Sequence, residues 1–197
     1  NWTPQTVPNG AGHTARFDLS FAQPRTVTLD LPVTLGALLL DAPVAPHLTG
    51  TVPLTFSHGA MPSLLEVALG HPTLAVPVAV PAETTALIEP DTSLTLAGNL
   101  SGAGTFTAQG GGTLILMATN TVAGTRVSDA TLQLGPDASL EAPLTLDNAT
   151  LATTADHDSA AALIHGAYGA TVAPFDNTTL TLSGPVSGAG GLVKTGS

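Results

Sequence analysis

Asp156, His157 and Asp158 form the tightest group of ionisable side chains in this sequence. Two carboxylates beside an imidazole are residue types that bind a hard cation or transfer protons in general acid–base chemistry. Calcium usually takes about six to eight oxygen ligands, and two neighbouring carboxylates supply too few of them. We therefore interpret the group as a solvated loop tip and predict no metal site here.

The remaining carboxylates are scattered along the chain. Enzymes that cleave glycosidic bonds bring two carboxyl groups together across the scissile bond, so a close carboxylate pair would indicate such chemistry. Glu89 and Asp91 flank Pro90, and this trio is typical of a turn before the segment at Ser93. The other single carboxylates include Asp18, Asp30, Asp41, Glu66, Glu83, Glu141, Asp147 and Asp176. We predict no catalytic pair among them.

The histidines and the glycine-rich stretches also lack a known site pattern. None of the histidines has zinc-type spacing; they are His13, His47, His58, His71, His157 and His165. A Ser-His-Asp triad stays open, because its members need not be neighbours in sequence, but the chain has no Gly-x-Ser-x-Gly elbow. The runs QGGG and GAGG lack the lysine of a phosphate loop, and Lys194 is expected to be a surface charge. We predict no enzyme activity and no cofactor.

Composition narrows the possible partners. The 197 residues carry a net charge of −10, which argues against nucleic acid and against anionic lipid as partners. Hydrophobic residues make up 43% of the chain but aromatic residues only 4%, so the core must consist of Leu, Val and Ala. There is no cysteine, which excludes thiolate sites and suits an exported protein. No apolar run reaches the roughly 20 residues of a membrane span, so we expect no membrane insertion by this segment.

Short alternating strands are the elements that would position any site. In residues 25–33, Val27, Leu29 and Leu31 are expected on one face and threonine on the other. Residues 1–16 are predicted as an N-terminal loop or cap, with the regular fold over 17–197. Residues 158–169 could form a short helix, with a loop or bulge as the alternative. Further strands are expected at 51–56, 63–69, 73–80, 93–98, 112–118, 130–135, 142–154 and 178–184.

One sequence occurs twice: SLTLAGNLSGAGTF begins at Ser93, and TLTLSGPVSGAGGL begins at Thr179, 86 residues later. A β-helix coil takes roughly 20–25 residues and buries its inner face by stacking, so this spacing is about four coils. The two SGAG turns are therefore predicted on the same side of the stack. Nine identical pairs relate 93–111 to 179–197: Leu94/Leu180, Thr95/Thr181, Leu96/Leu182, Gly98/Gly184, Ser101/Ser187, Gly102/Gly188, Ala103/Ala189, Gly104/Gly190 and Gly110/Gly196.

Residues 112–135, GTLILMATNTVAGTRVSDATLQLG, resemble the passenger-associated repeat of autotransporter proteins. Residues 184–197 resemble the lead-in to a second copy, so the related segments are 93–135 and 179–197. Met117-Ala118 and Ala130 depart from the usual Ser-Gly and Gly. The matching positions are Gly112, Thr113, Leu114, Leu116, Asn120, Thr121, Gly124, Thr125, Val127, Thr131, Leu132, Leu134 and Gly135.

The resemblance implies an all-β fold, a right-handed single-stranded parallel β-helix, exported to the bacterial cell surface or beyond. The expected function is a non-enzymatic structural stalk, adhesin or extracellular fibre, and a carbohydrate-active or carbohydrate-binding β-helix is the alternative. Host or matrix glycans or proteins are possible partners. The inward core is expected to include Leu94, Leu96, Leu114, Leu116, Leu132, Leu134, Leu180 and Leu182.

The segment after Gly184 has no capping pattern, so its last coil is expected to present an open strand edge. Further coils of the same chain, or copies stacked end to end, are the expected partners of that edge. Four Asn-x-Ser/Thr sequons, at Asn1, Asn99, Asn148 and Asn177, are expected by chance in a Thr-rich chain, and we predict little glycosylation.

Overall fold

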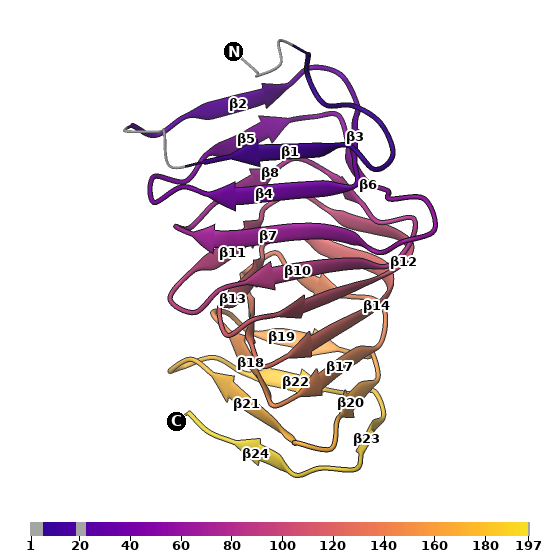
Figure 1. Cartoon of the computed structure of the whole chain (residues 1–197). Coiled ribbons are helices and arrows are strands. Elements are labelled where there is room, and N and C mark those ends of the chain that lie inside the picture. The colour runs from indigo at the N-terminus through magenta and orange to yellow at the C-terminus, as the bar shows by residue number, and fades with distance from the viewer. Residues whose placement is uncertain (1–5, 19–22, 197) are drawn as a thin grey trace.

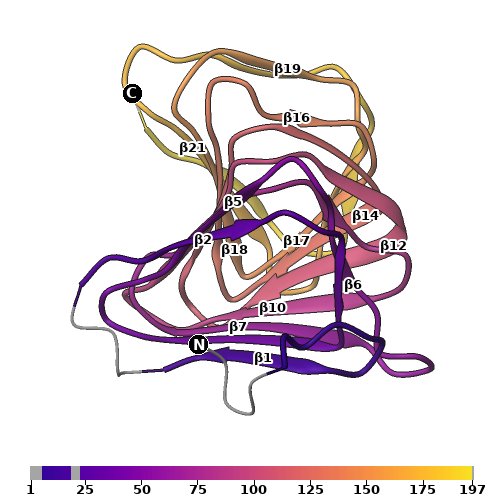
Figure 2. The same cartoon turned by 90° about the horizontal axis from the view of Figure 1, so that it is seen from above.

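The computed structural model describes residues 6–18 and 23–196, and within these ranges the chain contains strands and turns but no helix. The strands are short and parallel, and they stack in successive coils from the N-terminal to the C-terminal end (Figure 1). Seen along the stack, each coil has a roughly three-sided outline, and the later coils are turned relative to the first (Figure 2). The fold is a β-solenoid, as predicted.

Three faces, A, B and C, form its sides. Face A contains β1 (Thr14–Phe17), β4 (Ala37–Asp41), β7 (Ser63–Leu69), β10 (Thr84–Ile88), β12 (Leu100–Gln109), β14 (Thr119–Ser128), β17 (Leu144–Asp147), β20 (Leu163–His165) and β23 (Val186–Gly188). Face B contains β2 (Thr26–Leu29), β5 (His47–Gly50), β8 (Thr73–Ala75), β11 (Ser93–Leu96), β13 (Thr113–Leu116), β15 (Thr131–Leu134), β18 (Ala149–Thr153), β21 (Ala170–Pro174) and β24 (Leu192–Lys194).

Face C is formed by shorter strands and by the first halves of β12 and β14, which continue from face C into face A. Leu100 of β12 pairs with Val78 on one side and with Asn120 of β14 on the other. The other strands of face C are β3 (Val33–Leu35), β6 (Leu54–Phe56), β9 (Val78–Ala79), β16 (Ser139–Leu140), β19 (His157–Ser159) and β22 (Leu180–Leu182).

The core consists of inward columns of small and branched apolar side chains. On face B, Leu94, Leu114, Leu132, Leu151 and Val172 stack in register, which gives coils of 18 to 21 residues at these positions. All of these side chains are buried, and leucine occupies every second position of β11, β13 and β15, between Ser, Thr, Ile and Gln residues that are only partly buried. The alternation puts Leu inside and the intervening residues outside, because successive side chains of a strand point to opposite faces.

A buried polar pair fixes the corner between faces C and A. Asn120 and Thr125 are both buried, and the Asn120 side-chain amide donates to the Thr125 hydroxyl at 2.7 Å. The amide oxygen of Asn120 accepts the Val122 backbone N–H at 3.3 Å. Buried polar groups need such partners, so this pair holds β14 where it turns between the two faces.

The corner from face A to face B uses a left-handed residue in one coil after another. Non-glycine residues with positive φ are costly, and Asn and Asp tolerate this conformation best. The side-chain amide of Asn148 donates to the Asp129 carboxylate of the preceding coil at 2.7 Å, which links two such corners. The residues of this series are Gly70, Asp91, Gly110, Gly111, Asp129, Asn148 and Gly169.

Several local predictions need correction. Residues 158–169 contain the end of β19 and all of β20 and no helix, because Leu163 is needed in the inward column of face A. The predicted N-terminal loop is shorter than 1–16, since β1 begins at Thr14 and pairs with β4; residues 1–5 lie outside the described residues. Leu31 is 68% exposed, because β2 ends at Leu29.

The prediction that the two SGAG turns lie on the same side of the stack is wrong. The first copy enters from β11 on face B, whereas the second enters from β22 on face C. Four coils after Leu94 the register reaches Val172, and Leu180 lies eight residues further along the chain. The spacing of 86 residues is therefore four coils plus about one face.

The inward orientation is confirmed for the six predicted leucines of β11, β13 and β15, which are all buried. Leu180 and Leu182 pack against the core but are only partly buried.

Candidate functional site

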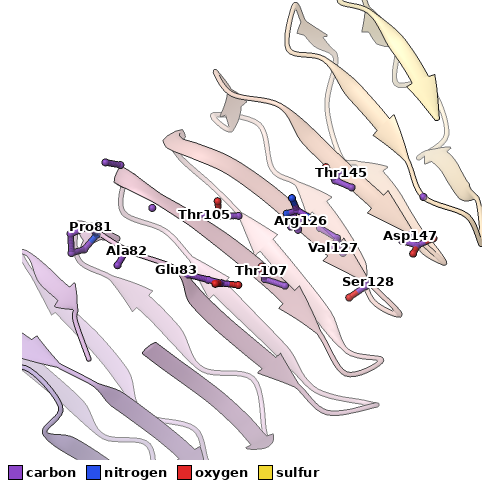
Figure 3. Close-up of a pocket in the computed structure, with 13 residues that line it drawn as sticks. Pro81, Ala82, Glu83, Thr105, Thr107, Arg126, Val127, Ser128, Thr145 and Asp147 are labelled. Carbon is purple, nitrogen blue, oxygen red and sulfur yellow. The ribbon is translucent and has the colours of Figure 1, made fainter. Parts of the chain in front are cut away.

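An open groove of about 780 Å³ lies on the outer side of face A. It crosses four successive coils: the turn just before β10, the second halves of β12 and β14, and β17 (Figure 3). Thr107, Arg126 and Thr145 are paired residues of neighbouring strands and point outward in one column. Ser128 and Asp147 form the next column.

Irregular backbone in the first SGAG segment shapes one wall of the groove. The pairing of β12 with β14 shifts register between Gly102 and Thr105, and Ala103 and Gly104 line the hollow. A Cβ on Gly104 would overlap the carbonyl oxygen of Ala82, so only glycine permits this approach of two coils. A bulge bends a strand and redirects its side chains, which explains why the hollow lies beside it.

Three charged side chains mark the groove. Arg126 is exposed at its centre, with Glu83 on one side and Asp147 on the other (Figure 3). One oxygen of Asp147 accepts the backbone N–H of Tyr168 at 2.8 Å, which fixes the orientation of this carboxylate. Within residues 6–18 and 23–196, the side chain of Arg126 has neither a hydrogen bond nor an ion pair, in contrast to that of Arg16, which contacts Asp41 at 2.9 Å.

Asp156 and Asp158 contribute to coil stacking and do not form a joint site. The Asp156 carboxylate accepts the Thr179 backbone N–H at 2.7 Å, and the Asp158 carboxylate accepts the Ser183 hydroxyl at 3.1 Å. His157, between them, pairs with Leu180 in the ladder of β19 and β22. The described residues contain no group of three or more His, Asp or Glu side chains that could hold a metal ion.

His71 and Ser93 are the nearest approach to a nucleophile and its base. The ring Nδ1 of His71, which is exposed on the turn before β8, lies 3.1 Å from the hydroxyl oxygen of Ser93 at the start of β11. A hydrolytic triad also needs a carboxylate that orients the imidazole. In the part of the chain that the structure describes, no carboxylate hydrogen-bonds to His71, so the pair stands alone.

A second, smaller hollow of about 240 Å³ lies on face B near the C-terminal end. Its lining includes Asn148, Thr150, Tyr168 and Thr171. Tyr168 is 83% exposed at its rim. An exposed aromatic ring beside hydroxyl and amide groups is suited to contact with a sugar.

Sequence reasoning gave Glu83 and Asp147 as single carboxylates and did not consider Arg126. The sequence did single out Arg126 in one respect: it is the only Lys or Arg between Arg25 and Lys194.

Comparison of the chain with known protein families, with curated proteins and with solved structures finds no match in any of the three. Among the described residues there is also no helix with the length and apolar character needed to cross a membrane.

Proposed function

We propose that this chain is a non-enzymatic, extracellular β-solenoid of a bacterial surface or secreted protein, serving as a structural stalk, adhesin or fibre. The supporting observation is the continuous core, in which inward Leu, Val and Ala columns extend through successive coils. Such a stack forms an elongated body from a simple repeat and leaves three long outer faces available for contact.

The sequence adds support for the location. Residues 93–135 and 179–197 resemble passenger-associated repeats of autotransporters, and the resemblance implies export across the outer membrane.

The outward positions of face B are mostly uncharged and hydroxylated, as in the column Ser93, Thr113, Thr131, Thr150 and Thr171.

The last coil supports a further part of the proposal. Val186, Leu192 and Val193 are each more than 40% exposed, on β23 and β24. Within the described residues, these strands are paired on one side only. We propose that this edge pairs with a further coil of the same chain or with a second copy, since open edges with apolar side chains are templates for another strand.

The location is tested on intact cells of the organism that produces the protein. Antibodies against the folded chain should label these cells, and externally added protease should remove the label. Labelling that requires lysis of the cells would contradict the proposal.

The groove on face A favours saccharide binding as a second candidate function. Its volume lies within the usual range of ligand sites, about 300–1,000 Å³. The lining supplies hydroxyls from threonine and serine, one guanidinium and two carboxylates, which together can donate to and accept from sugar hydroxyls. Titration of the chain with a panel of neutral and acidic oligosaccharides, followed by NMR at groove residues, tests this candidate.

A further inference from the structure

We propose that the groove on face A binds a saccharide that carries a carboxylate, and that Arg126 selects this ligand over a neutral saccharide. The inference rests on the saccharide-binding candidate above and adds the ligand class and the residue that determines it.

Arg126 has an unused capacity to bind an anion. Its planar guanidinium has five N–H donors that match the two oxygens of a carboxylate. The contrast with Arg16 is direct, because Arg16 already donates to Asp41, whereas Arg126 has no acidic partner among the described residues. Glu83 and Asp147 line the same groove, yet neither lies within 4.0 Å of the guanidinium.

The neighbours of Arg126 suit the rest of a sugar. Thr107 and Thr145 are its ladder partners on either side, and neighbouring strands are about 4.8 Å apart. Their hydroxyls can donate and accept. Glu83 and Asp147 flank this row (Figure 3), and their carboxylates can accept hydrogen bonds from the hydroxyls of a ligand whose own carboxylate lies on Arg126.

Other anionic partners fit less well. A nucleic acid or another polyanion needs several cations, whereas the groove has one Arg and two carboxylates on a chain of net charge −10. A peptide binds through large side chains in apolar pockets. The apolar lining here consists of Pro81, Ala82, Ala103 and Val127, and Val127 is buried in the core.

The test compares a trimer of galacturonate with its fully methyl-esterified, uncharged form, titrated into the 197-residue chain and followed by NMR. We expect the acidic trimer to bind about fivefold more tightly, which corresponds to about 1 kcal/mol for an exposed ion pair. Shifts should concentrate at Thr107, Arg126 and Thr145. The preference should decrease as the ionic strength rises.

Two variants make the test specific. Arg126→Gln should abolish the preference for the acid, and Arg25→Gln, which removes the same charge outside the groove, should retain it. Arg126 is exposed and makes no contact that folding needs, so the thermal midpoint of Arg126→Gln should equal that of the unchanged chain.

Each other outcome overturns a defined claim. Equal binding of both trimers at the groove overturns the role of Arg126 and leaves saccharide binding in place. Equal loss of preference in both variants shows a general charge effect and also overturns that role. Binding of neither trimer, nor of any saccharide in the wider panel, overturns the saccharide-binding candidate itself.

Discussion

Residues 93–104 lie in the middle of the stack, whereas the closely related residues 179–190 lie in its last described coils. In the first segment, Leu94 and Leu96 are buried, and β11 pairs with β8 on one side and β13 on the other. In the second, Leu180 and Leu182 are only partly buried, and within the described chain β22 pairs with β19 alone.

The local structure of the two segments is nevertheless similar. A Cβ on Gly104 would overlap the carbonyl oxygen of Ala82, and a Cβ on Gly190 would overlap that of Gly166. Both glycines thus lie directly on the preceding coil, although the segments occupy different faces. The sequence determines the local path of the chain, and the coils on either side determine how much apolar surface is buried.

The largest expected difference between the two segments is the loss of stability caused by an Asp at an inward leucine position. Leu96→Asp buries an unpaired carboxylate between two coils and should lower the free energy of unfolding by about 4 kcal/mol or more. Leu182→Asp leaves the carboxylate access to water and should cost about 1 kcal/mol. Urea unfolding followed by circular dichroism measures both.

Unchanged unfolding of Leu96→Asp would show that the assigned register of β11 is wrong. Equal losses in the two variants would mean that the last coil is covered in solution, for example by a second copy.

A smaller effect is expected from a methyl group at the coil contacts. Gly104→Ala forces two coils apart in the middle of the stack and should cost about 1–3 kcal/mol. Gly190→Ala should cost less, because the last coil can shift. Gly124→Ala is the matched control, since its Cβ meets only the Pro143 carbonyl oxygen at 3.8 Å. Thermal unfolding of the three variants should follow this order; a control as unstable as Gly104→Ala would contradict the steric explanation.

The strands and their inward faces were predictable because a period of two in Leu and Thr directly encodes which side is buried. The coil period was missed. It is carried by Gly111-Gly112-Thr113, Asp129-Ala130-Thr131, Asn148-Ala149-Thr150 and Gly169-Ala170-Thr171, which begin faces that stack on each other. The first residue of each changes identity between Gly, Asp and Asn, and only the positive φ is shared.

The groove could not be predicted, because its residues come together only through the register of the coils. Thr84 and Phe106 are paired across 22 residues, whereas Thr125 and Leu144 are paired across 19. With such variable coils, the sequence alone does not show that Thr107, Arg126 and Thr145 share a column. The bulge after Gly102 adds a further shift that no spacing indicates.

The smallest expected effect concerns the acidic group at β19, in the same coils as the second segment. Asp156 and Asp158 each accept a hydrogen bond from the next coil, at Thr179 and Ser183, so their carboxylates already have protein partners. A calcium site would need about six to eight oxygens, and the two carboxylates bind different residues of that coil. Unfolding midpoints with and without EDTA should therefore agree.

Asp156→Asn retains an oxygen acceptor for the Thr179 N–H and should lower stability by no more than about 1 kcal/mol. A large loss of stability on chelation, abolished in this variant, would instead assign a cation to these residues and would make the last coils dependent on metal where the middle coils are not.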